Sequence, residues 1–230
     1  MKLPDPIRKV SDAFAELPSI GPRQAIRLVF YLLGKGQNNI QNLSRALEEL
    51  KSVKICERCF FPTLTPGPRS PQGVGAISSN NGALCDICAN PARRQDLIVI
   101  VEKETDLLSI ENTGKFGGRY FILGTVSKTG LLEDWQKLRL QNLKTFIEKN
   151  LPLTSSRQGD KAPSTGSGQA EEIVLAFNPT SFGDFGASLV EKELKPFAKK
   201  ITRLGRGLPT GGEIEFADDE TLGSALEKRS

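Results

Sequence analysis

Four cysteines in two C-x-x-C pairs carry the plainest chemistry of this 230-residue chain. Cys56 and Cys59 form the first pair, Cys85 and Cys88 form the second, and the sequence contains no histidine. A two-residue spacer lets a knuckle turn direct both sulfurs at one ion, so the pattern predicts one tetrahedral four-cysteine zinc site. Such a site is closed to water and substrate, so its Zn²⁺, one per chain, is expected to be structural.

Two disulfides or a pair of redox-active motifs are the alternatives for the same cysteines. Disulfides are typical of secreted proteins, whereas residues 1–14 are rich in charge and lack an apolar signal region. Redox C-x-x-C motifs usually lie in a βαβ context, which these do not. The intervening segment 60–84 is long and rich in Gly, Pro, Ser and Asn, a length that loop-closure entropy tolerates. The sequence therefore favours zinc.

A second group with binding chemistry lies near the N-terminus, where residues 17–23 read Leu-Pro-Ser-Ile-Gly-Pro-Arg, as in a helix-hairpin-helix turn. Gly21 lets the backbone approach a phosphate, and the free N–H groups that open the next helix add donors and a positive dipole end. Arg23 and Arg27 lie one turn apart on that helix, within reach of backbone phosphates. An ordinary turn with solvated arginines is the alternative, but beside a zinc module the pattern favours DNA.

Two carboxylates form the third candidate group. Glu102 follows the apolar run 97–101, at the carboxyl end of a predicted buried strand, where open α/β sheets place their ligand sites. Asp184 follows the strand predicted at 173–177 and is expected near Glu102. Two converging carboxylates are able to hold Mg²⁺, although a strand-end glutamate is more often only solvated. No P-loop motif occurs, and the absence of histidine excludes Ser-His and Cys-His catalysis.

Apolar periodicity indicates the elements that position these groups. Residues 4–51 predict three helices, with a proline at the first position of the second. From residue 97 onward, buried strands alternate with helices, which predicts an α/β sheet of parallel strands. The strands are expected at 97–101, 120–123, 173–177 and 201–204, and the helices at about 104–113, 131–149 and 183–198. Segment 152–170, which has few apolar residues, is predicted to be a mobile surface insertion.

The composition bounds the function only loosely. Hydrophobic residues make up 38% and charged residues 25%, as in a soluble globular protein, and no stretch approaches a membrane span. The net charge of +4 permits nucleic-acid binding without requiring it, because the basic residues are spread along the chain. Trp135 and the phenylalanines are spaced like core residues, which predicts no base-stacking platform.

The order of these modules resembles one family, the bacterial recombination mediator protein RecR. The similarity covers nearly the whole chain. It rests on residues 17–23, the four cysteines, residues 90–95, 101–102, 113–121, 178–180, 207–215 and 221–222. The resemblance implies an α/β fold in which a Toprim-type parallel sheet domain is preceded by an all-α helix-hairpin-helix domain and a small zinc finger. The implied boundaries are 1–52 for the helical domain, 53–92 for the zinc finger, 93–200 for the Toprim domain and 201–230 for a C-terminal Walker-B-like segment and helix.

The same resemblance implies a role in DNA repair and recombination. Members of the family assemble as ring-shaped tetramers that can encircle DNA, and they act with RecO and RecF to help load RecA at single-stranded gaps. They are not known as enzymes, and a cytoplasmic location is expected. The acidic Toprim surface, here Glu102 with Asp184, is associated with RecO contact.

An Mg²⁺-dependent Toprim nuclease or topoisomerase-like enzyme is the alternative from another class. Such an enzyme needs an acid cluster to hold the metal, and a topoisomerase adds a tyrosine nucleophile. Segment 182–184 carries only Asp184 where paired acids are usual, and Tyr31 and Tyr120 both lie inside apolar patterns. A protein-only adaptor is a third alternative, against which the two arginines of the hairpin argue. The sequence therefore favours a non-enzymatic DNA-binding mediator.

Overall fold

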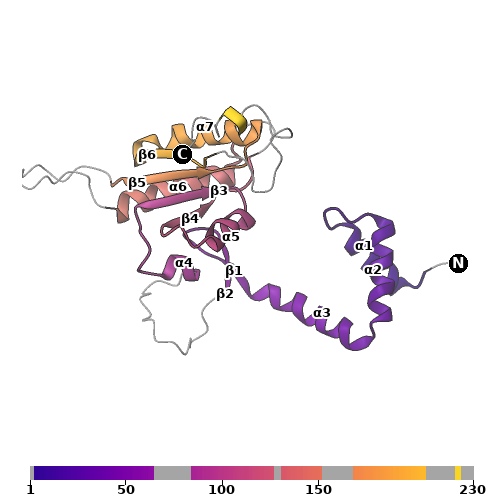
Figure 1. The fold of residues 1–230 in the computed structure, drawn as a ribbon. Helices are drawn as coiled ribbons and strands as arrows, with labels where there is room; N and C mark the ends of the chain where they lie inside the picture. Colours follow the sequence, from indigo (N-terminus) through magenta and orange to yellow (C-terminus); the bar gives the residue numbers. More distant parts are fainter. Residues whose placement is uncertain (1–2, 65–83, 127–130, 152–167, 206–220, 224–230) are drawn as a thin grey trace, which may run out of the picture. The chain divides into compact units, whose positions relative to one another are not determined.

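A computed structural model describes residues 3–64, 84–126, 131–151, 168–205 and 221–223 of the chain (Figure 1). The chain divides into two compact units, residues 1–53 and 54–230. Most of the segment between the cysteine pairs, most of the predicted insertion and the Walker-B-like stretch lie outside the described residues.

The first unit is helical, as predicted. It contains α1 (Asp5–Ala15), α2 (Pro22–Gly34), α3 (Gln37–Glu49) and the short 3₁₀ helix η1 (Leu50–Ser52). The ring of Pro22 presets the helical φ, and its missing N–H would have no partner in the first turn, so it opens α2 directly after Gly21. Helices α1 and α2 pack against each other.

Little of this first unit is buried. Among its described residues Ser11, Ala25 and Val29 are buried, and α3 contributes none. Several large apolar side chains are exposed instead: Val10, Leu17, Phe30, Tyr31, Leu33, Leu43, Leu47 and Leu50. The apolar pattern around Tyr31 therefore does not bury it, and 59% of this residue is exposed. A unit of this size with so small a core gains little hydrophobic stabilisation by itself.

The second unit is built on a four-stranded sheet, which confirms the predicted α/β class. The strands run in the order β4 (Arg119–Ile122), β3 (Leu97–Val101), β5 (Ala170–Ala176) and β6 (Ala198–Arg203), and every neighbouring pair is parallel. In the register, Ile98 of β3 lies beside Arg119 of β4 and Ile173 of β5. Buried parallel strands read as continuous apolar runs, and β3 does so.

The two faces of this sheet are covered by different elements. Ile98 and Ile100 belong to a cluster with α6 (Asp134–Asn150) and α7 (Ser181–Leu194). Val99 and Val101 point to the other face and pack with α5 (Glu104–Asn112). In Figure 1, α5 accordingly lies across the sheet from α7, and the cysteine segment (residues 53–64 and 84–89) lies beside the end strand β4. The sheet is thus the middle of three layers, and the carboxyl ends of its strands meet at one edge.

Two predicted boundaries are corrected by the structure. Strand β5 begins at the fully buried Ala170, so the insertion cannot extend to that residue. Gly168 also packs closely, because a Cβ there would lie 2.3 Å from the carbonyl oxygen of Leu151. Strand β6 begins at Ala198, so the boundary placed at residue 200 cuts through it. Strands β5 and β6 begin with the small or charged residues Ala-Glu-Glu and Ala-Lys-Lys, so the apolar pattern did not reveal where either strand begins.

Candidate metal centre and nucleic-acid interface

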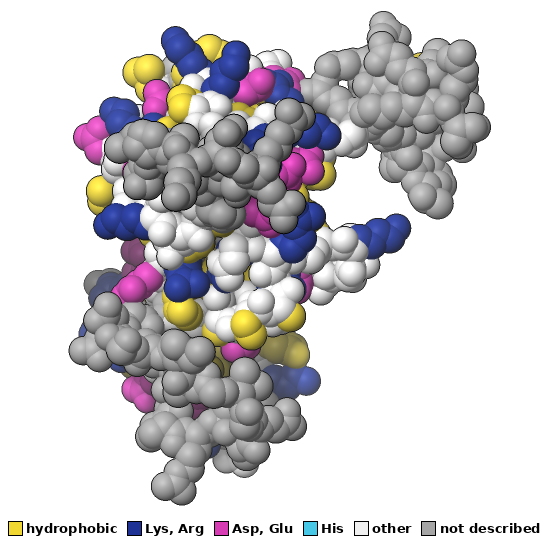
Figure 2. All heavy atoms as spheres, turned by 90° about the vertical axis from the view of Figure 1, so that its left-hand side faces the viewer, with side chains coloured by type: hydrophobic (Ala, Val, Ile, Leu, Met, Phe, Trp, Pro, Cys, Tyr) yellow, Lys and Arg dark blue, Asp and Glu magenta, His cyan; other side chains and the backbone are white. Residues whose placement is uncertain are grey.

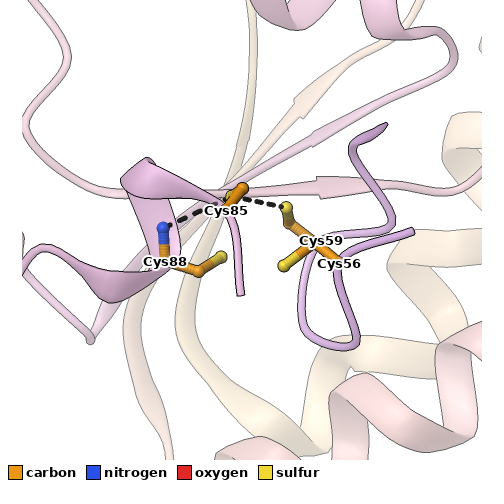
Figure 3. Close-up of side chains that lie close together, drawn as sticks. All are labelled: Cys56, Cys59, Cys85 and Cys88. Atoms are coloured by element: carbon orange, nitrogen blue, oxygen red, sulfur yellow. Dashed lines mark hydrogen bonds between the residues drawn. The ribbon is translucent and has the colours of Figure 1, made fainter. Parts of the chain in front are cut away.

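The structure brings all four cysteines together, as the spacing predicted. Strands β1 (Val53–Ile55) and β2 (Pro62–Leu64) form a two-stranded sheet whose connection carries the first pair, and α4 (Asp86–Ala89) begins directly after Cys85. The four sulfurs lie within 4.8 Å of one another and all four cysteines are buried. Figure 3 shows the two pairs facing each other, with the sulfurs of Cys59 and Cys85 at 3.4 Å.

Local backbone geometry holds each pair in place. In the first knuckle, Cys56 donates its N–H to Phe61 at 2.9 Å, and Phe60 donates its own to Cys56 at 2.9 Å. In the second, the N–H of Cys88 donates to Cys85 Sγ at 3.5 Å. The last of these N–H groups points at a sulfur, so it stabilises the thiolate form of Cys85, the form that binds a metal.

Phe60 adopts a left-handed φ of +64°, a conformation that an aromatic residue rarely takes. Its ring and the ring of Phe121 in β4 lie in an edge-to-face arrangement, with their centres 5.5 Å apart. The guanidinium of Arg139 lies 4.4 Å from the centre of the Phe60 ring. These contacts offset the local strain and anchor the first knuckle on β4 and α6.

The donor set fits a structural zinc ion. Four sulfur donors in a buried, closed arrangement match the preference of Zn²⁺ for thiolates, and all four cysteines are free. Hydrogen bonding with Cys59 lowers the pKa of the Cys56 thiol, and the same contact raises the pKa of Cys59. Thiols must lose their protons to bind a metal, so binding is expected to release protons and to weaken as the pH falls.

Further contacts join the cysteine segment to the sheet. Ile122 of β4 donates its backbone N–H to the carbonyl oxygen of Cys59 at 2.9 Å. Arg119 at the start of the same strand donates from Nη1 to the carbonyl oxygen of Cys88 at 3.1 Å. Phe61 and Ile87 pack against the apolar face around Val99. The cysteine cluster is therefore packed into the second unit and does not form a separate domain.

The helix-hairpin-helix residues occupy the positions that the sequence predicted. Gly21 caps α2, and no atom lies within 4 Å of where its Cβ would be, so open space surrounds this backbone. Arg23 and Arg27 are both exposed on α2 and form no ion pair with any described residue. Ser19, in the hairpin, has a left-handed φ of +67°, which sequence reasoning did not foresee. The geometry leaves the arginines and the helix N-terminus available to an anion.

The two predicted acids have different partners. Glu102 is 4% exposed, and its Oε2 accepts hydrogen bonds from the backbone N–H and from Nδ2 of Asn178, at 2.9 and 2.5 Å. Asp184 is half-buried, and its carboxylate lies 3.9 Å from Nη1 of Arg203. Glu102 therefore ties the end of β3 to the loop after β5, and it is not a surface acid. The polar Asn-Pro-Thr sequence after β5 was the available signal for this partner.

Within the described parts of the chain, the four cysteines are the only group of three or more potential metal-ligating side chains. Tyr120 is buried; burial and the nearby Glu111 raise its pKa. This tyrosine is therefore poorly suited to act as a nucleophile. The expectation that Trp135 and the phenylalanines are core residues was wrong for four of them, because Phe30, Trp135, Phe182 and Phe185 are exposed at the surface. Apolar periodicity marks one face of a helix, but not how completely its neighbours cover it.

The surface of the second unit carries both signs of charge. On the face drawn in Figure 2, Lys and Arg side chains are scattered among Asp and Glu, without a broad field of one sign. Several exposed or half-exposed basic groups are paired with acids, as Lys199 is with Glu171 at 2.6 Å. None of the described helices is both long and apolar enough to cross a membrane.

Comparisons with known proteins agree with the order of the modules. Family models match residues 7–51 as "RecR, helix-hairpin-helix", 96–205 as "Toprim domain" and 207–230 as "RecR, C-terminal". Among curated relatives named "Recombination protein RecR", one from Chloroflexus aurantiacus is 36% identical and covers 97% of this chain and 93% of the relative. One from Roseiflexus sp. is 34% identical, and the match covers 99% of this chain and 94% of the relative. One from Dehalococcoides mccartyi is 33% identical, and the match covers 97% of this chain and 93% of the relative.

Proposed function

The chain belongs to the RecR family of recombination proteins, and from that premise we propose that it is a non-enzymatic, DNA-binding recombination mediator. In this proposal it acts in the cytoplasm with RecO and RecF and promotes the loading of RecA at single-stranded gaps. The observation that carries the DNA-binding part is the exposed pair Arg23 and Arg27, one turn apart behind the open backbone of Gly21. Such contacts bind phosphates and give no specificity for the base sequence.

We propose that Cys56, Cys59, Cys85 and Cys88 hold one structural Zn²⁺ per chain. The support is the grouping of four buried sulfurs within 4.8 Å and the backbone contacts that tie both knuckles to the sheet. We propose a helical domain to residue 52, a zinc module from 53 to 92, a Toprim domain from 93 to Arg203, where β6 ends, and a C-terminal segment after it.

A homo-oligomer, most simply the ring tetramer of the family, is the proposed assembly. The support is the exposed apolar surface of the helical unit, where Leu43, Leu47 and Leu50 of α3 and η1 are exposed or partly exposed. Apolar side chains clustered in this way on one helix are typical of a protein–protein interface. One hairpin offers few phosphate contacts, so several copies in one assembly would add their contacts through effective concentration.

The proposed RecO contact lies at the edge where the strands of the sheet end. Asp184 is half-buried there, and Glu104 at the start of α5 is exposed. Glu102 takes part by holding Asn178 in place, because its own carboxylate is turned inward. The proposal that the protein is not an enzyme is supported by the separate partners of Glu102 and Asp184 and by the buried hydroxyl of Tyr120.

A salt titration of DNA binding tests the proposed interface. The Arg23→Ala/Arg27→Ala variant removes the two exposed arginines, and Arg8→Ala/Arg45→Ala removes the same charge from α1 and α3. Each lost phosphate contact on duplex DNA reduces the slope of log K against log salt by about 0.9. We expect a smaller slope for the first variant alone, equal weakening for all DNA sequences, and unchanged size in light scattering. Equal slopes for both variants would show that DNA is held elsewhere.

A further inference from the structure

A buried arginine lies beside the cysteine cluster without a carboxylate partner. Arg119 is 5% exposed, and its hydrogen bond from Nη1 reaches only the carbonyl oxygen of Cys88. Its Nε is buried without a hydrogen-bond partner, and Arg119 takes part in none of the ion pairs between described residues. A buried guanidinium stays charged, and leaving it uncompensated costs several kcal/mol. Arg119 is therefore a buried positive charge that no carboxylate among the described residues compensates.

The cysteine cluster supplies the missing charge. Four thiolates around one divalent ion carry a double negative charge, and this charge is buried because all four cysteines are. Arg119 reaches this cluster directly, because it donates to the carbonyl oxygen of Cys88 and lines the same small pocket as that residue. A buried positive charge and a buried negative charge that lie next to each other compensate each other.

We propose that Arg119 is the buried counter-charge of the metal centre: it offsets the negative charge of the metal-bound thiolates and so strengthens metal retention. This inference rests on the proposed zinc site. Arg119 is a positioning residue here, since it touches the backbone of Cys88 and not the metal. The role belongs to β4 of the sheet, so metal binding and the fold of the sheet are coupled through one side chain.

Arg58 completes the arrangement from the solvent side. It lies between the two cysteines of the first knuckle, is exposed, and its guanidinium lies 5.7 Å from the centre of the Phe146 ring. Arg119 lies 5.9 Å from the centre of the same ring, and the three residues line one small pocket with Cys88. Solvent screens the charge of Arg58, so its contribution is expected to be the smaller of the two.

Arg139 offers a matched control. It is also partly buried, donates to a backbone carbonyl oxygen, that of Ile122, at 3.0 Å, and lies over the rings of Phe60 and Trp135. Burial lowers its pKa too, but no cysteine is among the charges that act on it. The two arginines thus differ mainly in whether they neighbour the thiolates.

Competition with a chromogenic chelator measures zinc affinity in wild type, Arg119→Met, Arg119→Lys, Arg58→Met and Arg139→Met. Loss of a residue that supports metal ligands typically weakens binding about 10–100-fold. We expect that loss for Arg119→Met, partial recovery for Arg119→Lys, and a loss of only a few-fold for Arg58→Met. Arg139→Met removes a contact to the Phe60 ring but no charge beside the thiolates. It should therefore weaken zinc binding less than Arg119→Met does, and it should lower the melting temperature equally with and without zinc.

Thermal unfolding with and without zinc separates this role from a general structural one. Without metal, Arg119→Met removes an uncompensated buried charge, so this variant should melt no lower than metal-free wild type. With zinc bound, the variant should melt lower than wild type. Equal zinc affinities, or an equal loss of melting temperature in both states, would overturn the role of Arg119 alone. A wild type that binds no zinc would overturn the metal centre and this role together.

Discussion

Replacement of Glu102 decides whether this carboxylate is an internal support or a surface contact. Its Oε2 accepts two hydrogen bonds from Asn178 and the residue is 4% exposed. A hydrogen bond to a charged group contributes about 1.5–3 kcal/mol, and because Asn178 itself is exposed, water replaces part of what is lost. We therefore expect Glu102→Ala to lower the free energy of unfolding by about 2–4 kcal/mol. Glu102→Gln keeps an acceptor and should cost about half as much.

Asp184→Asn is the control at the same edge of the sheet. Its ion pair with Arg203 spans 3.9 Å between partly exposed groups, so losing this ion pair should cost at most about 1 kcal/mol. Urea unfolding followed by the fluorescence of Trp135, the single tryptophan, measures all three variants. If Glu102→Ala unfolds within about 0.5 kcal/mol of wild type, the internal role is wrong and the side chain is free to contact a partner.

Three further outcomes follow from the same contacts. Metal analysis of freshly purified reduced protein should give one zinc per chain, and a metal-free wild type would contradict the zinc site. Cys85→Ser leaves three ligands, so this variant should lose most of the metal and the zinc module should unfold. Leu47→Lys places a charge on the exposed apolar face of α3 and should reduce the particle mass in light scattering, whereas an unchanged mass would exclude this face from the assembly. Neither Mg²⁺-dependent nicking nor ATP hydrolysis is expected, and nicking that disappears in Glu102→Ala would favour the enzyme.

Local patterns predicted the parts of the site that depend on near neighbours in the sequence. The two C-x-x-C spacings place each sulfur pair by one turn of backbone, and the grouping of all four was correct. The continuous apolar run 97–101 was recognisable as a parallel strand because both of its faces are buried. Gly21 and Pro22 indicated the start of α2, because the preference for proline at the first helical position depends only on the first turn of the helix.

Contacts between distant segments were beyond such patterns. Arg119 follows Cys88 by 31 residues, and nothing in its local sequence distinguishes a buried counter-charge from a solvated arginine. Asn178 follows Glu102 by 76 residues, so the carboxylate was placed correctly at a strand end but given the wrong surroundings. Tyr31 shows the converse error, since periodicity identifies an apolar face without identifying what covers it.

The two units draw their stability from different sources. In the second unit, the sheet lies in two apolar clusters, and three contacts of β4 reach the cysteine segment: the N–H of Ile122, the guanidinium of Arg119 and the ring of Phe121. The first unit has three buried residues among those described and many exposed apolar ones. Metal loss should therefore weaken the sheet domain first. Dilution should weaken the helical domain first, because in the proposed assembly other copies of the chain cover its apolar surface. Chelation should therefore act mainly on the metal-binding sheet domain. Dilution should act mainly on the helical domain and on the DNA binding proposed for it.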